Sequence, residues 1–214
     1  MTACSPRPEE DVAVLVPCLE GLSPALADIL GLLPIRAANA ALLQGLAAAA
    51  SPVPLVAGVL SVDPFLNGDA LYRRLAARGV AGVVNLPSVA MADGALQQAL
   101  AMAGLDAAQE LQALARARHH GLEPVAMVFS RAEAARAAAL AIHRMIVHPG
   151  LPSGDAVRDR ASSEAALATA EALRREGVDA MVYRHPDLAR WIPASVGGKG
   201  QLAWRAGLRA QPSP

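Results

Sequence analysis

Aromatic residues are scarce in this 214-residue sequence, where Phe, Trp and Tyr together make up only 3%. Proteins that bind single-stranded nucleic acid stack its bases on aromatic side chains, and this chain has too few for such a surface. Its 19 basic and 19 acidic residues cancel, so no net charge attracts polyanions or an anionic membrane. We therefore expect neither nucleic acid nor membrane as a partner. Neutrality also favours self-association, and we expect a homo-oligomer.

Cysteine is also scarce, since Cys4 and Cys18 are the only two in the chain and no Cys-x-x-Cys spacing occurs. The first residues, MTACSPRPEED, are polar and do not fit a signal peptide. We therefore expect no disulfide framework and a reducing, cytoplasmic setting. One uncharged stretch, residues 37–62, is long enough to cross a membrane, but prolines and polar side chains interrupt it. A helix followed by a buried strand explains this stretch better.

Short, continuous apolar runs are the main positive feature of the sequence, in which 54% of residues are hydrophobic. Such runs are typical of strands buried on both faces of a parallel sheet. They predict strands at about residues 12–16, 54–60, 81–86, 124–129, 144–148 and 179–183. Between them lie Ala- and Leu-rich stretches with helical spacing, at about residues 37–49, 67–77, 94–119, 131–141, 162–176 and 186–191.

This alternation predicts an α/β fold with a parallel sheet, which can be a closed barrel or an open doubly wound sheet. Further strands in residues 22–35 and 193–204 would bring the number to eight. The length suits a single domain over residues 1–214, with a tail that frays at 205–214. We predict a (β/α) barrel of the TIM type, either complete or shortened.

Polar residues follow the predicted strands, and ligands gather at the carboxyl ends of strands in both kinds of α/β fold. Five strands are followed by such residues, in the segments Ser61-Val62-Asp63-Pro64, Asn85-Leu86-Pro87-Ser88, Ser130, His148-Pro149-Gly150 and Arg184-His185. We expect a ligand site at this edge of the sheet.

Each of these side chains also has a purely structural interpretation. Asp63 before Pro64 fits a helix N-cap with proline in the first position, but a carboxylate there also suits a metal ligand or a base. Ser130 fits an N-cap better than a ligand contact. Asn85 begins no helix, so its buried amide needs partners from substrate or protein. His148 fits an acid, a base, a metal ligand or a buried structural histidine.

The strong motifs of several enzyme classes are absent. Residues 197–200, Gly-Gly-Lys-Gly, lack the spacing of a Walker phosphate loop. There is no dinucleotide glycine fingerprint, no nucleophile elbow, and no His/Cys/Asp cluster with metal-ligand spacing. A phosphate contact would have to come from Arg36, Arg184 or the 197–200 turn. The cofactor stays open, although Mg²⁺ would need only one carboxylate plus substrate oxygens.

Four segments together resemble a known family. They are PVPLVAGVLSVDPF, GVAGVVNLPSVAMADG, EPVAMVFSRAEAARAAALA and RMIVHPGLPSG, in this order and within about residues 30–155. The sequence resembles the phosphoenolpyruvate hydrolase-like TIM-barrel family, also described as TIM-barrel signal transduction proteins. The combination of Asn-x-Pro-x-Val-x-x-x-Asp-Gly with His-x-Gly-Leu carries the resemblance.

The resemblance implies an oligomeric (β/α) barrel and a hydrolase or lyase acting on a small anionic substrate, a 2-oxo acid or a phospho- or phosphono-carboxylate. By position, polar residues of the family's motifs match Asp63, Asn85, Asp93 and His148, and an Asn of another family segment matches Asn39. Together with the strand ends, this makes Asp63 and His148 the catalytic candidates. The expected substrate-binding residues are Asn39, Asn85, Ser88, Asp93, Ser130 and His185.

The chain also departs from the family pattern. An acidic residue of the family is replaced within residues 100–105, and the Thr-x-Gly-Gly after the histidine has become Leu-Pro-Ser-Gly at 151–154. A late His-Gly-Gly-Pro is reduced to Arg-His-Pro at 184–186. A non-catalytic relative that senses a ligand or serves in assembly is therefore the alternative to an enzyme. We favour the enzyme because the polar groups at the strand ends are kept.

Overall fold

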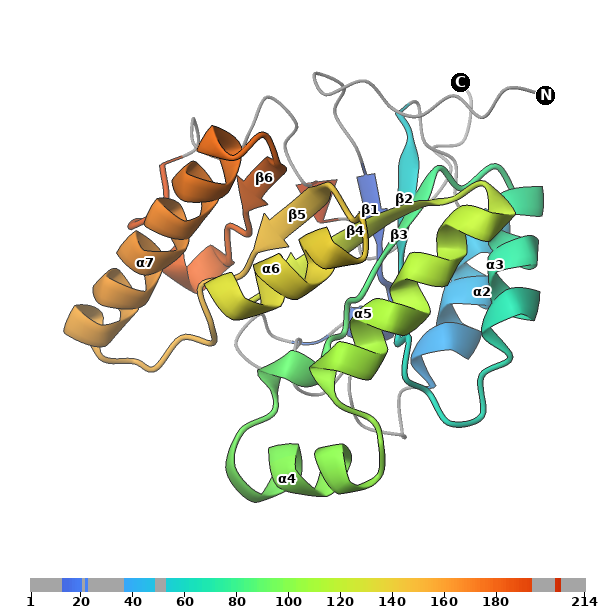
Figure 1. The fold of residues 1–214 in the computed structure, drawn as a ribbon, viewed down its shortest axis with the longest axis horizontal. Coiled ribbons are helices and arrows are strands. Elements are labelled where there is room, and N and C mark those ends of the chain that lie inside the picture. Colours follow the sequence, from blue (N-terminus) through green and yellow to red (C-terminus); the bar gives the residue numbers. More distant parts are fainter. Residues whose placement is uncertain (1–12, 21, 23–36, 49–52, 194–202, 205–214) are drawn as a thin grey trace.

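The computed structural model describes residues 13–20, 22, 37–48, 53–193 and 203–204 (Figure 1). Its strands are β1 (Ala13–Leu15), β2 (Leu55–Gly58), β3 (Gly82–Val84), β4 (Glu123–Val128), β5 (Arg144–Val147), β6 (Asp179–Val182) and β7 (Ala203–Trp204). Its α-helices are α2 (Ala38–Ala48), α3 (Gly68–Ala77), α4 (Gly94–Met102), α5 (Ala107–Ala115), α6 (Arg131–Ala139) and α7 (Ala156–Arg175). Short 3-10 helices are η1 (Pro17–Leu19), η3 (Val89–Met91), η4 (Arg116–His120) and η5 (Pro186–Leu188).

The strands form one parallel sheet in the order β6-β5-β4-β3-β2-β1-β7. From β1 to β6 the order in the sheet is the order in the chain, whereas a doubly wound sheet reverses direction at a switch point. β7 returns to pair with β1, with Ala203 opposite Ala13, as the last strand of a barrel pairs with the first. Among the described residues β6 and β7 are not paired, so the sheet is a curled, open arc.

The helices pack on one face of this sheet. Buried residues from α2, α3, α5, α6 and α7 share a core with alternate strand residues such as Ala57 and Ala126, and we call this side the helix-covered face. The other strand residues, such as Val56 and Met127, form a second core with η1 on what we call the concave face. A doubly wound sheet carries helices on both faces. The fold is therefore α/β, a shortened TIM-type barrel, as the sequence predicts.

All six predicted strands are confirmed, with small changes at their ends. β7 falls in residues 193–204, one of the two segments suggested for a further strand. The other segment, residues 22–35, lies outside the described residues apart from Leu22, and so does the predicted frayed tail at 205–214. In the described part of the chain, no helix has the length and apolar character needed to cross a membrane.

The prediction of one long helix over residues 94–119 is wrong. The chain turns after α4, where Gly104 has a φ of 71°, a left-handed conformation that glycine adopts readily. α5 then begins after Asp106, whose carboxylate accepts a hydrogen bond from the amide of Gln109. α4 projects away from the sheet (Figure 1) and has no buried residue.

Two further helix boundaries differ from the prediction. α7 begins at Ala156 rather than near residue 162, because the side chain of Asp155 accepts hydrogen bonds from the amides of Val157 and Arg158. The predicted helix at 186–191 is only the short η5. Neither change moves a strand.

Candidate functional site

The alternation of side chains along each strand decides on which face a strand-end residue lies. Val147 belongs to the helix-covered core, so the next residue, His148, lies on the concave face. Val84 belongs to the concave core, so Asn85 lies on the helix-covered face. The predicted site residues at this edge are therefore divided between the two faces of the sheet.

His148 lies in a row of rings on the concave face. Its ring stacks on that of Tyr183, with centroids 4.6 Å apart, and lies 4.8 Å from that of Phe129. Tyr183 in turn meets His185 edge-on at 6.3 Å. These residues follow β4, β5 and β6, which are neighbours in the sheet. His148 is 2% exposed and His185 is fully buried, so the two imidazoles lie in a largely dry environment.

The two histidines share a local structure that arises from the sequence His-Pro-x. Nδ1 of His148 accepts a hydrogen bond from the amide of Gly150 at 3.0 Å, and Nδ1 of His185 accepts one from the amide of Asp187 at 3.1 Å. A ring nitrogen that accepts a hydrogen bond carries no proton, so each neutral imidazole has its proton on Nε2. We refer to His148 and His185 as the histidine pair.

On the helix-covered face, Asn85 connects β3 to β4 and α5. Its Oδ1 accepts from the amide of Met127 at 2.7 Å, and its Nδ2 donates to the carbonyl of Met127 at 3.1 Å. The same Nδ2 donates to the carboxylate of Glu110 at 2.8 Å. That carboxylate also accepts from the hydroxyl of Ser88 at 2.5 Å and from the amide of Val89 at 3.0 Å. We call these residues the Asn85–Glu110 network.

Glu110 is fully buried, and the loss of solvation raises the pKa of its carboxyl to about 7. The hydrogen bonds from Ser88, Asn85 and Val89 act in the opposite direction, because they favour the charged form. Both protonation states are therefore populated near neutral pH. Since its oxygens bond to neighbouring protein groups, we assign this carboxyl a structural role.

Sequence reasoning missed Glu110. It lies on the same side of α5 as Leu111 and Leu114, which are both buried. Glu110 precedes Leu111 by one residue and Leu114 by four, so the sequence already places an acidic residue on the apolar side of a predicted helix. This spacing was the signal that could have revealed a buried carboxyl. A buried carboxyl needs hydrogen-bond donors, and a polar strand end such as Asn85 is the natural place to look for them.

Asn39 and Asp63 lie together beyond the end of β2. Nδ2 of Asn39, on α2, donates to Oδ2 of Asp63 at 3.1 Å and to the carbonyl of Leu60 at 3.0 Å, and its Oδ1 accepts from the amide of Leu60 at 3.1 Å. The other carboxylate oxygen of Asp63 accepts from the amide of Phe65 at 3.0 Å. Asn39 thus fixes the loop after β2, and Asp63 is held from two sides.

The structural interpretations of the strand-end residues have mixed outcomes. Ser130 caps α6, because its Oγ accepts from the amide of Glu133 at 3.2 Å, as predicted. The interpretation of Asp63 as a helix N-cap is wrong, since a turn follows it and Asn67 caps α3. Asp93 is exposed at the start of α4 and makes no capping bond with its side chain. Roles for Ser88, Ser130 and Asp93 in substrate binding stay predictions.

The two predicted catalytic residues belong to different parts of this edge. Asp63 follows β2 and His148 follows β5, and two strands lie between these. At a strand spacing of about 4.8 Å, β2 and β5 are up to about 14 Å apart. Within the described residues, no three His, Cys, Asp or Glu side chains are grouped as metal ligands.

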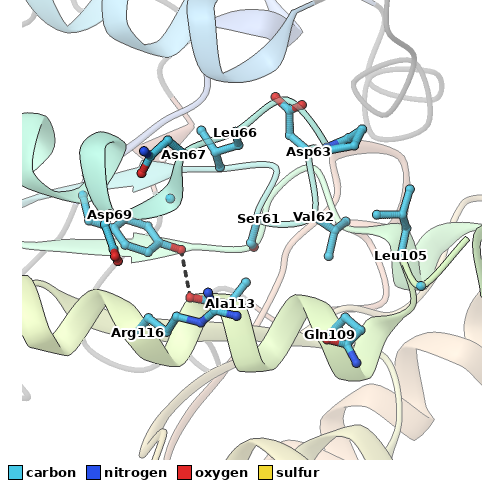
Figure 2. Close-up of a pocket in the computed structure, with 14 residues that line it drawn as sticks. Ser61, Val62, Asp63, Leu66, Asn67, Asp69, Leu105, Gln109, Ala113 and Arg116 are labelled. Atoms are coloured by element: carbon cyan, nitrogen blue, oxygen red, sulfur yellow. Dashed lines mark hydrogen bonds between the residues drawn. The ribbon is translucent and has the colours of Figure 1, made fainter.

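A groove of about 380 Å³ lies on the helix-covered side of the loop after β2 (Figure 2). Ser61, Val62 and Asp63 line it from the loop, and the first turn of α3 closes one end. The opposite wall consists of α5 with the turn before it, which contribute Gln109 and Leu105, and of the start of η4, which contributes Arg116. Of the predicted site residues, only Asp63 lines this groove.

The family named phosphoenolpyruvate hydrolase-like has a sequence model that matches residues 23–190, which include the strands β2 to β6 and both groups of strand-end residues. The chain belongs to this family. The match spans the histidine pair and the Asn85–Glu110 network alike, and it extends beyond residues 30–155, which carried the resemblance, to include His185.

Relatives of this phosphoenolpyruvate hydrolase-like chain include two tomato (Solanum lycopersicum) proteins, ToMV susceptible protein tm-1(GCR26) and ToMV resistance protein Tm-1(GCR237). Each is 30% identical over 167 residues, which cover 74% of this chain and 22% of the relative. The uncharacterized protein y4oT of Sinorhizobium fredii is 33% identical over 138 residues, covering 64% of this chain and 70% of the relative. The chain thus spans about a fifth of the tomato proteins.

Proposed function

We propose that this chain is an enzyme that acts on a small 2-oxo acid or on a phospho- or phosphono-carboxylate, as a hydrolase or lyase. Membership of the phosphoenolpyruvate hydrolase-like family supports the substrate class. The single observation that carries the proposal is the histidine pair, whose imidazoles follow adjacent parallel strands and share one tautomer. The carboxyl ends of barrel strands are where TIM-barrel enzymes place their reactive groups.

The chemistry of such substrates suits imidazole N–H donors. Cleavage beside a carbonyl or an enol phosphate builds negative charge on an oxygen atom, and donors fixed in advance stabilise that charge most in a dry site. Nε2–H of His148 would donate to this oxygen and could transfer its proton. His185, held by the same kind of hydrogen bond, would orient the substrate carboxylate.

Asp63 takes a lesser part in this proposal than the sequence predicted. It lies after β2, far from β5 for a substrate of a few carbon atoms, and both of its oxygens already accept hydrogen bonds. Mg²⁺ binding at Asp63 would need further oxygen ligands from substrate and water. We therefore place proton transfer on His148.

Ligand-induced stabilisation tests the proposal, because a ligand that binds only the folded state raises the melting temperature. Pyruvate, oxaloacetate, phosphoenolpyruvate and phosphonopyruvate would be screened with and without Mg²⁺, followed by turnover assays. His148→Asn is the informative variant, since the Asn oxygen can still accept from the Gly150 amide while Nε2 is lost. The exposed His119 provides the control His119→Asn.

We expect at least one compound to raise the melting temperature of the wild type and of His119→Asn, and His148→Asn to lose both this shift and turnover. An equal shift and equal turnover in His148→Asn would overturn the assignment of His148. No shift and no turnover with any compound would overturn the substrate class.

A non-catalytic role in ligand sensing or assembly is the second candidate, and the uncovered apolar side chains favour it. Phe65 is 96% exposed and Met102 is 90% exposed, and Leu96, on α4 like Met102, is half exposed. Large apolar side chains exposed to this extent are suited to contact with another molecule. Binding without turnover, combined with a concentration-dependent molecular mass in light scattering, would favour this function and a homo-oligomer.

A further inference from the structure

The groove beside α5 contains a buried polar atom that has no hydrogen-bond partner among the described residues. Ser61 is only 8% exposed, and its hydroxyl makes no hydrogen bond to any described residue. Figure 2 shows this hydroxyl directed from the loop after β2 toward α5. Buried hydroxyl groups are nearly always hydrogen-bonded, because leaving one unpaired costs free energy. A ligand in the groove would supply the missing partner.

The charged side chains that line the groove differ in whether they already have a hydrogen-bond partner. Asp63 accepts from Asn39 and Phe65, and the carboxylate of Asp69 lies 3.1 Å from Nε2 of His120. The side chain of Arg116, by contrast, lines the groove without a hydrogen bond or close ion pair to another described residue. The hydrogen bond from His120 and, to a smaller extent, the charge of Arg116 lower the pKa of the Asp69 carboxyl, so Arg116 acts on Asp69 only through space. The guanidinium of Arg116 and the hydroxyl of Ser61 are therefore two donors in this groove that have no hydrogen-bond acceptor among the described residues.

Apolar side chains complete the lining. Val62 and Leu105 line the groove from its two walls, and Figure 2 shows both between the loop after β2 and the start of α5. Two carboxylates also line the groove, and they would repel a doubly charged phosphate more strongly than a singly charged group. A planar carboxylate in addition matches the fork of donors on a guanidinium group.

We propose that this groove is a binding site for a small aliphatic carboxylate, whose charged end is held by Arg116 and Ser61 and whose hydrocarbon end lies against Val62 and Leu105. The site is separate from the histidine pair, because Ser61 faces the helices whereas the histidine pair lies on the concave face. The proposal therefore does not depend on the proposed catalytic function.

Titration calorimetry with butyrate on the full chain tests this site. Butyramide is the matched neutral probe, and inorganic phosphate tests for a general anion site. The variants are Arg116→Gln and Ser61→Ala, with Arg78→Gln as a control at an exposed arginine outside the groove. His148→Asn separates this site from the catalytic one.

We expect butyrate to bind the wild type, Arg78→Gln and His148→Asn alike, and butyramide and phosphate to bind at least about tenfold more weakly. Arg116→Gln should weaken butyrate binding about tenfold or more, because a charged donor is lost. Ser61→Ala should weaken binding a few-fold, while the melting temperature of the free protein stays equal or rises, because the unpaired hydroxyl is removed.

Three results would overturn the proposal. One is the absence of butyrate binding to the wild type. Another is butyrate affinity that does not change in Arg116→Gln. The third is phosphate or butyramide binding as tightly as butyrate, which would contradict the carboxylate class. Loss of butyrate binding in His148→Asn would instead place the carboxylate at the histidine pair and would equally overturn a separate groove site.

Discussion

The polar residues at the strand ends have different surroundings on the two faces of the sheet. On the helix-covered face, the Asn85–Glu110 network joins an amide, a hydroxyl and a carboxylate in hydrogen bonds that cross from β3 to β4 and α5. On the concave face, the histidine pair lies beside aromatic rings, and Nδ1 of each imidazole accepts a hydrogen bond from a backbone amide. Residues that look equivalent in sequence thus join a hydrogen-bonded network on one face and, in the function that we propose, supply the reactive groups on the other.

The largest loss of stability should occur when the Asn85–Glu110 network loses its carboxylate. Glu110→Ala removes the acceptor of the Ser88 hydroxyl and of the Val89 amide in the core, and leaves Nδ2 of Asn85 with the carbonyl of Met127 as its main acceptor. We expect the free energy of unfolding to fall by about 3–5 kcal/mol, measured by urea denaturation. Glu171→Ala, at an exposed position on α7, is the control and should change it by less than about 0.5 kcal/mol. A loss as small as that of the control would contradict a structural role for Glu110.

The network should also make stability depend on pH. The pKa of Glu110 is raised from its ordinary value of 4.5 to about 7, so the folded protein keeps a proton that the unfolded chain releases. The stabilisation from this group is therefore greatest below about pH 4.5 and is lost as the pH rises to about 7, by on the order of 3 kcal/mol.

Glu110→Gln isolates this effect, because an amide does not titrate in this range. Burial also raises the pKa of Glu133, which is present in both proteins and whose charge itself contributes to the raised pKa of Glu110. Denaturation of wild type and variant between pH 4.5 and 7.5 should show a steeper decline for the wild type. Parallel pH profiles would show that the carboxyl is already ionised throughout.

A smaller loss of stability is expected on the concave face. His148→Asn keeps an acceptor for the Gly150 amide but removes ring contact with Phe129 and Tyr183. We expect a decrease of about 1 kcal/mol, which corresponds to about 2–4 °C in melting temperature for a chain of this size. A decrease as large as that of Glu110→Ala would mean that the histidine pair is as much a structural element as the network.

The smallest effect should come from the exposed start of α4. The Asp93 side chain makes no capping hydrogen bond, so Asp93→Ala should change the free energy of unfolding by less than about 0.5 kcal/mol in the same urea experiment. A loss near 1 kcal/mol, typical of a removed N-cap, would show that this carboxylate does cap α4 in solution.

The sequence sufficed for the layout of the barrel because apolar runs mark buried strands whatever their surroundings. These runs do not show which strand residues face the helices, because a strand that is apolar on both faces has no alternation of polar and apolar residues in its sequence. For this reason Asn85 and His148 could be placed at strand ends but not on opposite faces. Gly104 and the N-cap Asp106 divide an Ala- and Leu-rich stretch into two helices, and the turn after Asp63 moves the cap of α3 to Asn67.

Glu110 shows a second limit. Its role depends on donors 21 to 25 residues away in the chain, at Val89, Ser88 and Asn85, and no local pattern reveals such pairing. The repeated His-Pro-x, in contrast, is visible in the sequence at 148–150 and 185–187. Its meaning becomes clear only when the strands bring the two copies to neighbouring positions.

Nitrogen NMR of the histidine side chains tests the central claim most directly. In ¹⁵N-histidine-labelled protein, we expect Nδ1 of His148 and of His185 to give the signal of a hydrogen-bond acceptor and Nε2 to carry the proton, and both sets of signals to move when phosphonopyruvate is added. The signals of exposed His119 should stay unchanged. A proton on Nδ1, or signals of the histidine pair that do not respond to any of the four candidate substrates, would contradict a reactive site on the concave face.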